Sequence, residues 1–255
     1  MPDSTLPHPQ GAVVWLDMLL TAQDEALQFY QPLLGWSGEP EPEDPNRYAV
    51  QKVHGKSVAG LGLMPAGDPV MPWTGYFGVT DIDAAVERIT RHGGGVILGA
   101  TEAPGIGRFA HGTDPGGAAF GLWQAAPFPG FELYGEPGCV YWLELMTTEG
   151  KASADFYAAL LQAEVQPMPE MPDSYWTIMV GGEPRAGIFR GEEVAKPHWR
   201  PYFQVADVDI AIAAALAAGA HLDSAAEDTP FGRMAGLIDP FGVEIRVATP
   251  PGTGA

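Results

Sequence analysis

Two tryptophan–carboxylate pairs are the residues that most suggest a ligand site. Trp15 is followed two positions later by Asp17, and Trp142 is followed at the same spacing by Glu144. Because the side chains of a strand alternate between its two faces, each tryptophan and its carboxylate point the same way if these segments are strands. An aromatic ring beside a carboxylate suits a flat, conjugated ligand that carries a hydroxyl or an amino group.

Further aromatic residues at strand spacing extend both predicted pockets. We predict that the first pocket is lined by Trp15, Asp17, Trp36, Tyr48, Trp73 and Tyr76, and the second by Trp142, Glu144, Trp176, His198, Trp199 and Tyr202. His198, beside Pro197, is a ligand contact, a general base or a surface residue. The alternative is that the tryptophans fill unused pockets while the carboxylates pair with Arg108 and Arg233, since a buried carboxylate needs a partner.

The elements that must position these residues occur twice, because the two halves align at an offset of 125 to 127 positions. Trp15 recurs as Trp142, Phe29-Tyr30 recurs as Phe156-Tyr157, and Asp114-Pro115 recurs as Asp239-Pro240. Each half reads twice as a strand, a helix and several strands. The sequence therefore predicts an α+β protein of four βαβββ units that form two half-open barrels.

The helix signals are local. Thr21 and Asp24 predict a capping-box-like start to a helix over Gln23 to Leu34, which Gly35 ends. Asp81 is predicted to cap a helix that runs to about His92. The predicted organisation is a flexible tail over 1–10, a first domain over 11–124, a linker over 125–138, a second domain over 139–248, and a flexible tail over 249–255.

These motifs resemble those of the vicinal oxygen chelate superfamily, which contains glyoxalases, bleomycin-resistance proteins and dioxygenases. The resemblance covers nearly the whole chain, and its motifs are Phe29-Tyr30, Leu34-Gly35-Trp36, Val79 to Asp83, Asp114 to Gly117 and their counterparts in the second half. The chain is similar to tandem, two-domain actinobacterial members named as hydroxylases or glyoxalase-like proteins. Some of these accompany aromatic polyketide and anthracycline biosynthesis.

The resemblance also says where a metal would bind. Metal enzymes of the superfamily place His, Glu or Gln at the start of each unit's first strand and a carboxylate on its last strand. In this chain the first-strand positions hold Trp15, Thr74, Trp142 and Arg200, and the last-strand positions hold Gly121 and Arg246. None of these is a usual ligand, so we predict no metal. A shift of two residues would offer His198, Glu144 and Glu244 instead.

Composition narrows the partners. The formal charge of −19 argues against nucleic acid and anionic membranes as partners. The single cysteine, Cys139, allows no disulfide within the chain, and no apolar run is long enough to span a membrane. We expect a cytoplasmic monomer or homodimer.

The function that these observations favour is binding of an aromatic, hydrophobic natural product such as an anthracycline or polyketide, without metal or other cofactor. Such binding would support self-resistance or biosynthesis. The alternative is an enzyme of the same superfamily, a hydroxylase, isomerase or lyase, with Glu144 or Asp17 as the base and with or without an off-register divalent metal. A third possibility is an interaction protein with vestigial pockets.

Overall fold

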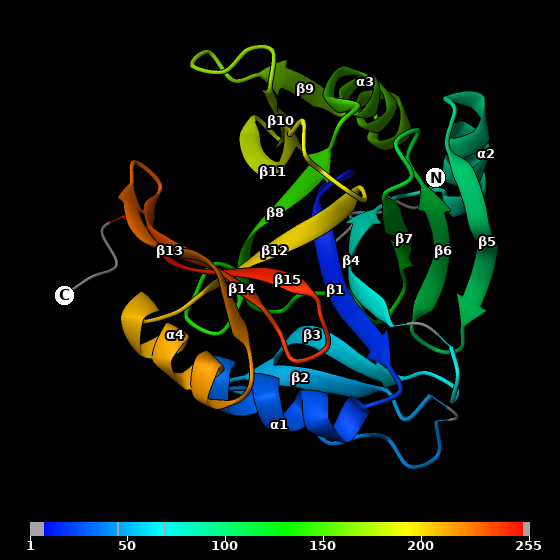
Figure 1. The fold of residues 1–255 in the computed structure, drawn as a ribbon. Coiled ribbons are helices and arrows are strands. Elements are labelled where there is room, and N and C mark those ends of the chain that lie inside the picture. The colour runs from blue at the N-terminus through cyan, green and yellow to red at the C-terminus, as the bar shows by residue number, and fades with distance from the viewer. Residues whose placement is uncertain (1–7, 45, 69, 252–255) are drawn as a thin grey trace. The chain divides into compact units, whose positions relative to one another are not determined.

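The computed structural model describes residues 8–44, 46–68 and 70–251, so most of the two predicted tails lies outside the described residues. The first half runs β1 (Val13–Leu20), α1 (Gln23–Leu34), β2 (Ala49–Val53), β3 (Lys56–Leu63), β4 (Met71–Gly78), α2 (Ile82–Arg91), β5 (Gly95–Ala103), β6 (Gly107–Thr113) and β7 (Ala119–Ala125) (Figure 1). The second half runs β8 (Val140–Thr147), α3 (Gly150–Leu161), β9 (Glu164–Pro167), β10 (Tyr175–Val180), β11 (Glu183–Arg190), β12 (His198–Gln204), α4 (Val208–Ala217), β13 (His221–Thr229), β14 (Gly232–Ile238) and β15 (Glu244–Thr249).

The strands form two mixed sheets. The seven-stranded sheet has the order β2-β3-β1-β4-β7-β6-β5, and the eight-stranded sheet has the order β13-β14-β15-β12-β8-β11-β10-β9. Each first strand of a βαβββ module pairs in parallel with the last strand of its own module, as β1 does with β3 and β12 with β15. The first module has only an isolated bridge, Ser37 to Lys52, where the third module has β9. The predicted α+β fold of four βαβββ modules in two half-open barrels is confirmed.

The chain divides into two compact units that do not follow the order of the sequence. One unit contains residues 1–15, 74–130 and 143–199, and the other contains 16–73, 131–142 and 200–255. The second module is thus grouped with the third, and the first module with the fourth, whereas each sheet joins consecutive modules, the first with the second and the third with the fourth.

The helices begin and end largely for local reasons. The side chains of Asp81 and Asp207 accept the backbone N–H groups of Ala84 and Ile210, each at 3.0 Å, and so cap α2 and α4. Gly35 ends α1 with a left-handed φ of 67°, as predicted. The predicted capping box at Thr21 is wrong, because α1 begins after Ala22 without a side-chain cap.

A tryptophan, a tyrosine and an aspartate of the repeated motifs meet beneath the helices. In the unit that contains the first module, Nε1 of Trp73 donates to the Tyr30 hydroxyl at 3.0 Å, and that hydroxyl donates to Oδ2 of Asp239 at 2.6 Å. Burial raises the pKa of both Tyr30 and Asp239. The other unit repeats the first contact, because Trp199 donates to Tyr157 at 3.0 Å. The Phe-Tyr and Asp-Pro motifs therefore serve the core.

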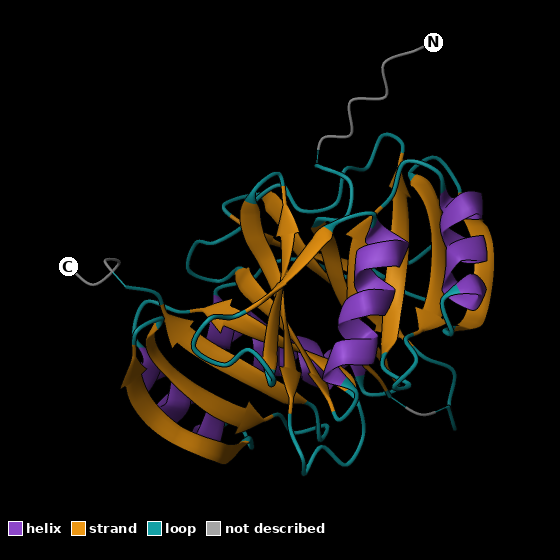
Figure 2. Cartoon of the chain, turned by 90° about the horizontal axis from the view of Figure 1, so that it is seen from above, coloured by secondary structure: helices purple, strands orange, loops and turns teal. Residues whose placement is uncertain are grey.

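The helices lie along one face of the curved sheets (Figure 2). Within the module of α2, that helix covers β5, β6 and β7, and within the module of α4, that helix covers β13, β14 and β15. The opposite side of each of these module sheets is called the helix-free face below. Among the described residues, no helix is long and apolar enough to cross a membrane.

Candidate functional site

Strand alternation decides which side chains of the fourth module reach the helix-free face. On β12, Phe203 packs against Trp73, with ring centroids 5.5 Å apart, on the face that the helices cover. Arg200 and Tyr202 therefore point the other way. On β14, Arg233 pairs with Asp209 of α4, so that Gly236 also belongs to the helix-free face.

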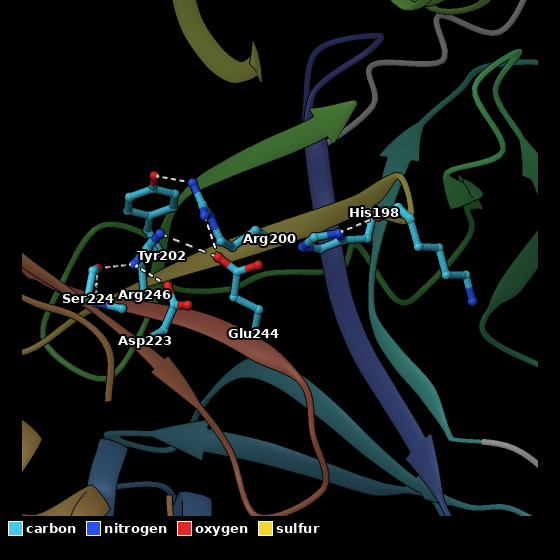
Figure 3. Close-up of polar contacts among 9 residues, drawn as sticks. His198, Arg200, Tyr202, Asp223, Ser224, Glu244 and Arg246 are labelled. Carbon is cyan, nitrogen blue, oxygen red and sulfur yellow. Dashed lines mark hydrogen bonds and ion pairs between the residues drawn. The ribbon is translucent and has the colours of Figure 1, made fainter. Parts of the chain in front are cut away.

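Two arginines on this face share one carboxylate (Figure 3). Nη1 of Arg200 forms an ion pair with Oε1 of Glu244, and Nη2 of Arg246 lies 3.4 Å from the same oxygen. Arg200 also donates to the Tyr202 hydroxyl at 3.2 Å. The Arg200 side chain is 7% exposed, whereas those of Arg246 and Glu244 are 15% and 21% exposed. The site is therefore charged and largely buried, and Arg246 and Glu244 are its more exposed members.

The network follows from the register of β12 and β15. These parallel strands place Tyr202 opposite Arg246. Arg200 and Glu244 each lie two positions earlier on their strands, so they come together on the same face. The pairing of charges across the strands therefore needs no loop to hold it.

A glycine makes room for the second arginine. Gly236 of β14 lies opposite Arg246 in the antiparallel pairing with β15. A Cβ atom at Gly236 would lie 1.6 Å from Nη1 of Arg246, so any other residue there would displace the guanidinium. Past this glycine, Nη1 donates to the hydroxyl of Ser224 and lies 3.1 Å from Oδ2 of Asp223.

The second module presents a different pair at the equivalent place. The Tyr76 hydroxyl and Nε2 of His111 form a hydrogen bond of 2.8 Å, and burial lowers the pKa of His111. Tyr76 lies across Gly121 of β7, where an added Cβ would be 2.2 Å from the tyrosine ring. The helix-free face of the second module is therefore aromatic at this position, and the Tyr76–His111 pair is uncharged at neutral pH.

The predicted residues of the first strand lie on the helix-free side of β1. Trp15 is buried and packs edge-on against Phe128, with ring centroids 5.0 Å apart. Asp17 is buried and accepts a hydrogen bond of 2.9 Å from the Tyr48 hydroxyl, which passes over Gly60. The alternative pairing of the carboxylates with Arg108 and Arg233 is wrong, because these arginines pair with Asp83 and Asp209 at helix starts.

Three of the predicted pocket tryptophans lie on the helix-covered side. Trp36 and Trp73 pack against Tyr30 and Phe203, and Nε1 of Trp36 donates to the Gly138 carbonyl at 2.5 Å. In the unit that contains the second and third modules, Trp199 packs against Phe77 in the same way. These rings contribute to the aromatic cores, where such pairs contribute about 0.5–1.5 kcal/mol each beyond their buried area.

Trp176 lies next to the start of α3. It lines a depression of about 970 Å³ together with Glu149, Lys151, Asp155 and Arg190. The walls mix acidic and basic groups. The depression therefore differs from the aromatic pocket predicted for Trp176, because these four neighbours are charged.

The remaining predicted residues belong to β8 and β12. Leu143 and Leu145 are buried on one side of β8, so alternation places Trp142 and Glu144 on its other side. Trp142 is partly exposed and Glu144 is 6% exposed. Nδ1 of His198 donates to the Lys196 carbonyl at 2.9 Å, as Figure 3 shows. Ligand binding by these residues stays a prediction.

Known proteins share both the sequence and the fold. Residues 142–248 match the model of the glyoxalase-like domain. The chain is 34% identical over 251 residues to CFP32 of Mycobacterium bovis, provisionally named a glyoxylase, which covers 95% of this chain and 96% of that protein. It is 33% identical over 270 residues to the anthracycline biosynthesis protein DnrV of Streptomyces peucetius, covering 96% and 97% of the two chains.

Solved structures extend the likeness. The Mn(II)-bound glyoxalase from Novosphingobium aromaticivorans superposes with a TM-score of 0.66 at 16% identity, over 94% of this chain and 82% of that one. The 2,3-dioxygenase LapB from Pseudomonas sp. KL28 gives a TM-score of 0.66 at 14% identity, over 95% and 93%. The chain belongs to the vicinal oxygen chelate superfamily.

The residues of the fourth module do not fit the metal that many members of this superfamily bind. Arg200 and Arg246 stand at the first-strand and last-strand positions, and a guanidinium offers a cation only donors and repulsion. Glu244, one member of the off-register set, already forms ion pairs with both arginines. Within 8–44, 46–68 and 70–251, no three His, Cys, Asp or Glu side chains are grouped so that they could hold a metal ion.

Sequence reasoning missed several residues of this site. Asp223, Ser224 and Gly236 were not singled out, and Arg246 was noted only as a misfit for a metal. The register of β13, β14 and β15 brings them together across two turns. A usable signal was present in Arg246, because a basic residue on a strand that is otherwise apolar must find partners when it is buried.

Proposed function

We propose that this protein binds a planar aromatic small molecule of the polyketide type on the helix-free face of its fourth module, without a metal ion. The observation that carries the proposal is the replacement of the metal-binding positions by Arg200 and Arg246, held by Glu244 and flanked by Tyr202. Guanidinium groups are well suited to both tasks that such a ligand sets, since they stack on aromatic faces and donate to oxygens.

Aromatic side chains near the network support the same ligand class. The ring of Tyr141 lies edge-on to Tyr202, with centroids 6.1 Å apart, and Trp142 follows directly in the chain and is partly exposed. The relationship to DnrV, an anthracycline biosynthesis protein, supports a role in the biosynthesis of such compounds. Flat, oxygen-rich rings would bind here by stacking and by hydrogen bonds to the arginines.

The test is calorimetric titration of the full chain, stripped of metal with a chelator, with an anthracycline and with a monocyclic phenol as the small control. Binding of the anthracycline that is unchanged by added Mn(II) supports the proposal. Binding that requires the metal, or no binding of any planar aromatic compound with or without it, overturns the proposal.

One observation favours catalysis as a second candidate. Glu144 is a buried carboxylate on β8, opposite Gly187 of β11. A buried carboxylate beside a bound aromatic ligand could serve as a general base. If the protein is an isomerase or lyase, Glu144→Gln abolishes turnover while the affinity for the ligand is retained. If it is only a binding protein, no turnover is found in either form.

A further inference from the structure

We infer that Arg246 binds a negatively charged oxygen pair of the ligand, in a two-pronged hydrogen bond that takes the place of a metal–oxygen bond. This inference rests on the proposed function and adds to it the chemical class of the bound group. The shared chemistry is two neighbouring oxygens that carry one negative charge, as in a carboxylate or in a phenolate beside a second oxygen.

The first argument is the number of donors that Arg246 has left. A guanidinium has five N–H groups. Arg246 uses Nη1 for Ser224 and Asp223, and it uses Nη2 only for a contact of 3.4 Å with Glu244. Within the part of the chain that the structure describes, Arg246 has no further partner. The edge formed by Nε and Nη2 is therefore available, and this is the edge that takes a carboxylate with two parallel bonds.

The second argument is that Arg246 is held in place for this purpose. Gly236 leaves the space that its guanidinium occupies, and Ser224 and Glu244 fix the plane from two sides. A preorganised guanidinium loses less freedom on binding than one on the open surface. Its 15% exposure also means that water screens its charge less than it would on the surface.

The third argument concerns Asp223, which pairs with Nη1 and leaves the edge formed by Nε and Nη2 uncovered. Its side chain is 37% exposed, and its contact with Arg246 is 3.1 Å. An ion pair with so exposed a partner is weak, so it offsets little of the positive charge that a ligand anion would meet at the other edge. Arg200 is the more deeply buried of the two arginines, and its contact with Glu244 keeps that carboxylate in place.

The experiment measures calorimetric affinity for 9,10-anthraquinone-2-carboxylate and for its uncharged carboxamide, using the full metal-stripped chain. We expect the carboxylate to bind about tenfold or more tightly than the carboxamide, as a charge-assisted pair of hydrogen bonds predicts. Arg246→Ala and Gly236→Ala should each remove this preference, because they should weaken binding of the carboxylate more than binding of the carboxamide. Asp223→Asn, which removes a neighbouring negative charge, should strengthen carboxylate binding.

Arg233→Ala is the matched control, because Arg233 is an arginine of the same module that pairs with Asp209 on the helix-covered side. It should change neither affinity. Alizarin, titrated across the ionisation of its hydroxyl, separates the two sources of charge. Binding that tightens with ionisation and depends on Arg246 adds phenolates to the ligand class, and carboxylate-only binding restricts the class to carboxylates.

Two results would overturn the inference, and they can be told apart. If the carboxylate and the carboxamide bind equally well, or if Gly236→Ala and Asp223→Asn do not change the preference, then Arg246 does not recognise the negative charge of the ligand. The proposed binding of a planar aromatic molecule is not contradicted by that result. If neither compound binds the wild-type chain, the proposed function fails and the inference with it.

Discussion

The second and fourth modules fill the same place on their helix-free faces from opposite strands. In the second module, His111 of β6 lies opposite Gly121 of β7, and in the fourth, Gly236 of β14 lies opposite Arg246 of β15. The large and small residues have thus been exchanged across one pair of positions. One backbone frame therefore holds a neutral tyrosine–histidine pair in one half and a charged network in the other.

In this repeat, the total side-chain volume at the paired positions is preserved more strictly than the charge and type of the side chains. Each glycine is present because a large side chain from a neighbouring strand crosses it, Tyr76 at Gly121 and Arg246 at Gly236. Close packing makes such positions interdependent, so a change on one strand requires a change on the next. The two halves are consequently equivalent as scaffolds and different as sites.

The largest expected effect comes from disrupting the charged network of the fourth module. Glu244→Gln removes the carboxylate that both arginines contact, and Ala119 stands at the equivalent position of the first half. We expect the free energy of unfolding to fall by about 3–5 kcal/mol, because an ion pair is lost beside a deeply buried arginine. Urea denaturation measures it.

Glu102→Gln is the control for that variant. Glu102 pairs with Arg108 at 3.0 Å, but its side chain is 72% exposed. A loss of no more than about 1 kcal/mol is expected there, as for other surface ion pairs. Equal losses for the two variants would show that burial does not distinguish these ion pairs.

A smaller effect tests the uncharged half. Gly121→Ala would place a Cβ atom 2.2–2.6 Å from three ring atoms of Tyr76, and we expect a loss of about 1–3 kcal/mol as that ring is pushed aside. Gly99→Ala is the matched control, because nothing lies within 4 Å of the added atom. Thermal unfolding followed by circular dichroism compares the two. Unchanged stability in Gly121→Ala would contradict the crossing of Tyr76 over this glycine.

The smallest expected effect concerns the two buried tyrosines on the helix-covered sides. The stability that each hydroxyl contributes should depend differently on pH. Burial raises the pKa of Asp239, and the hydrogen bond from Tyr30 opposes that rise. Without the hydroxyl the folded-state pKa rises further, so the cost of Tyr30→Phe is present above that pKa and fades as the pH falls through it. We expect a loss of about 1–2 kcal/mol at pH 8 and a smaller loss at pH 5.

Tyr157→Phe provides the comparison for that variant. Both tyrosines accept from a tryptophan, but Asp114 takes its hydrogen bond from Ser153 at 2.7 Å. Removal of the Tyr157 hydroxyl should therefore destabilise the protein with less dependence on pH. Chemical denaturation of both variants from pH 5 to pH 8 measures the difference, and identical pH profiles would argue against the Tyr30–Asp239 bond.

The helices could be predicted from the sequence because their signals are local. The range of α1 agrees with the prediction, as does the cap at Asp81, since a cap and a left-handed glycine act within one turn of the helix. Thr21 fails as a cap although it matches the pattern. A pattern of two residues does not determine which backbone groups actually meet.

The site was less predictable, because side-chain direction depends on strand register. Trp73 and Trp199 lie one position before Thr74 and Arg200, and that single step puts them on the opposite face. Their indole donors reach Tyr30 and Tyr157 in the core. Arg246 and Ser224 are 22 positions apart, and only the pairing of β13, β14 and β15 joins them. Composition and spacing do not supply that pairing.

The division of the chain into interleaved compact units has a consequence for biogenesis. The unit with residues 16–73 also needs residues 200–255, whereas the other unit is complete once residue 199 has been made. During synthesis, the pairing of β1 with β3 can form early, whereas the hydrogen bond from Tyr30 to Asp239 must wait for the C-terminal module. Such non-local closure slows folding and prolongs exposure of apolar strands to chaperones and proteases.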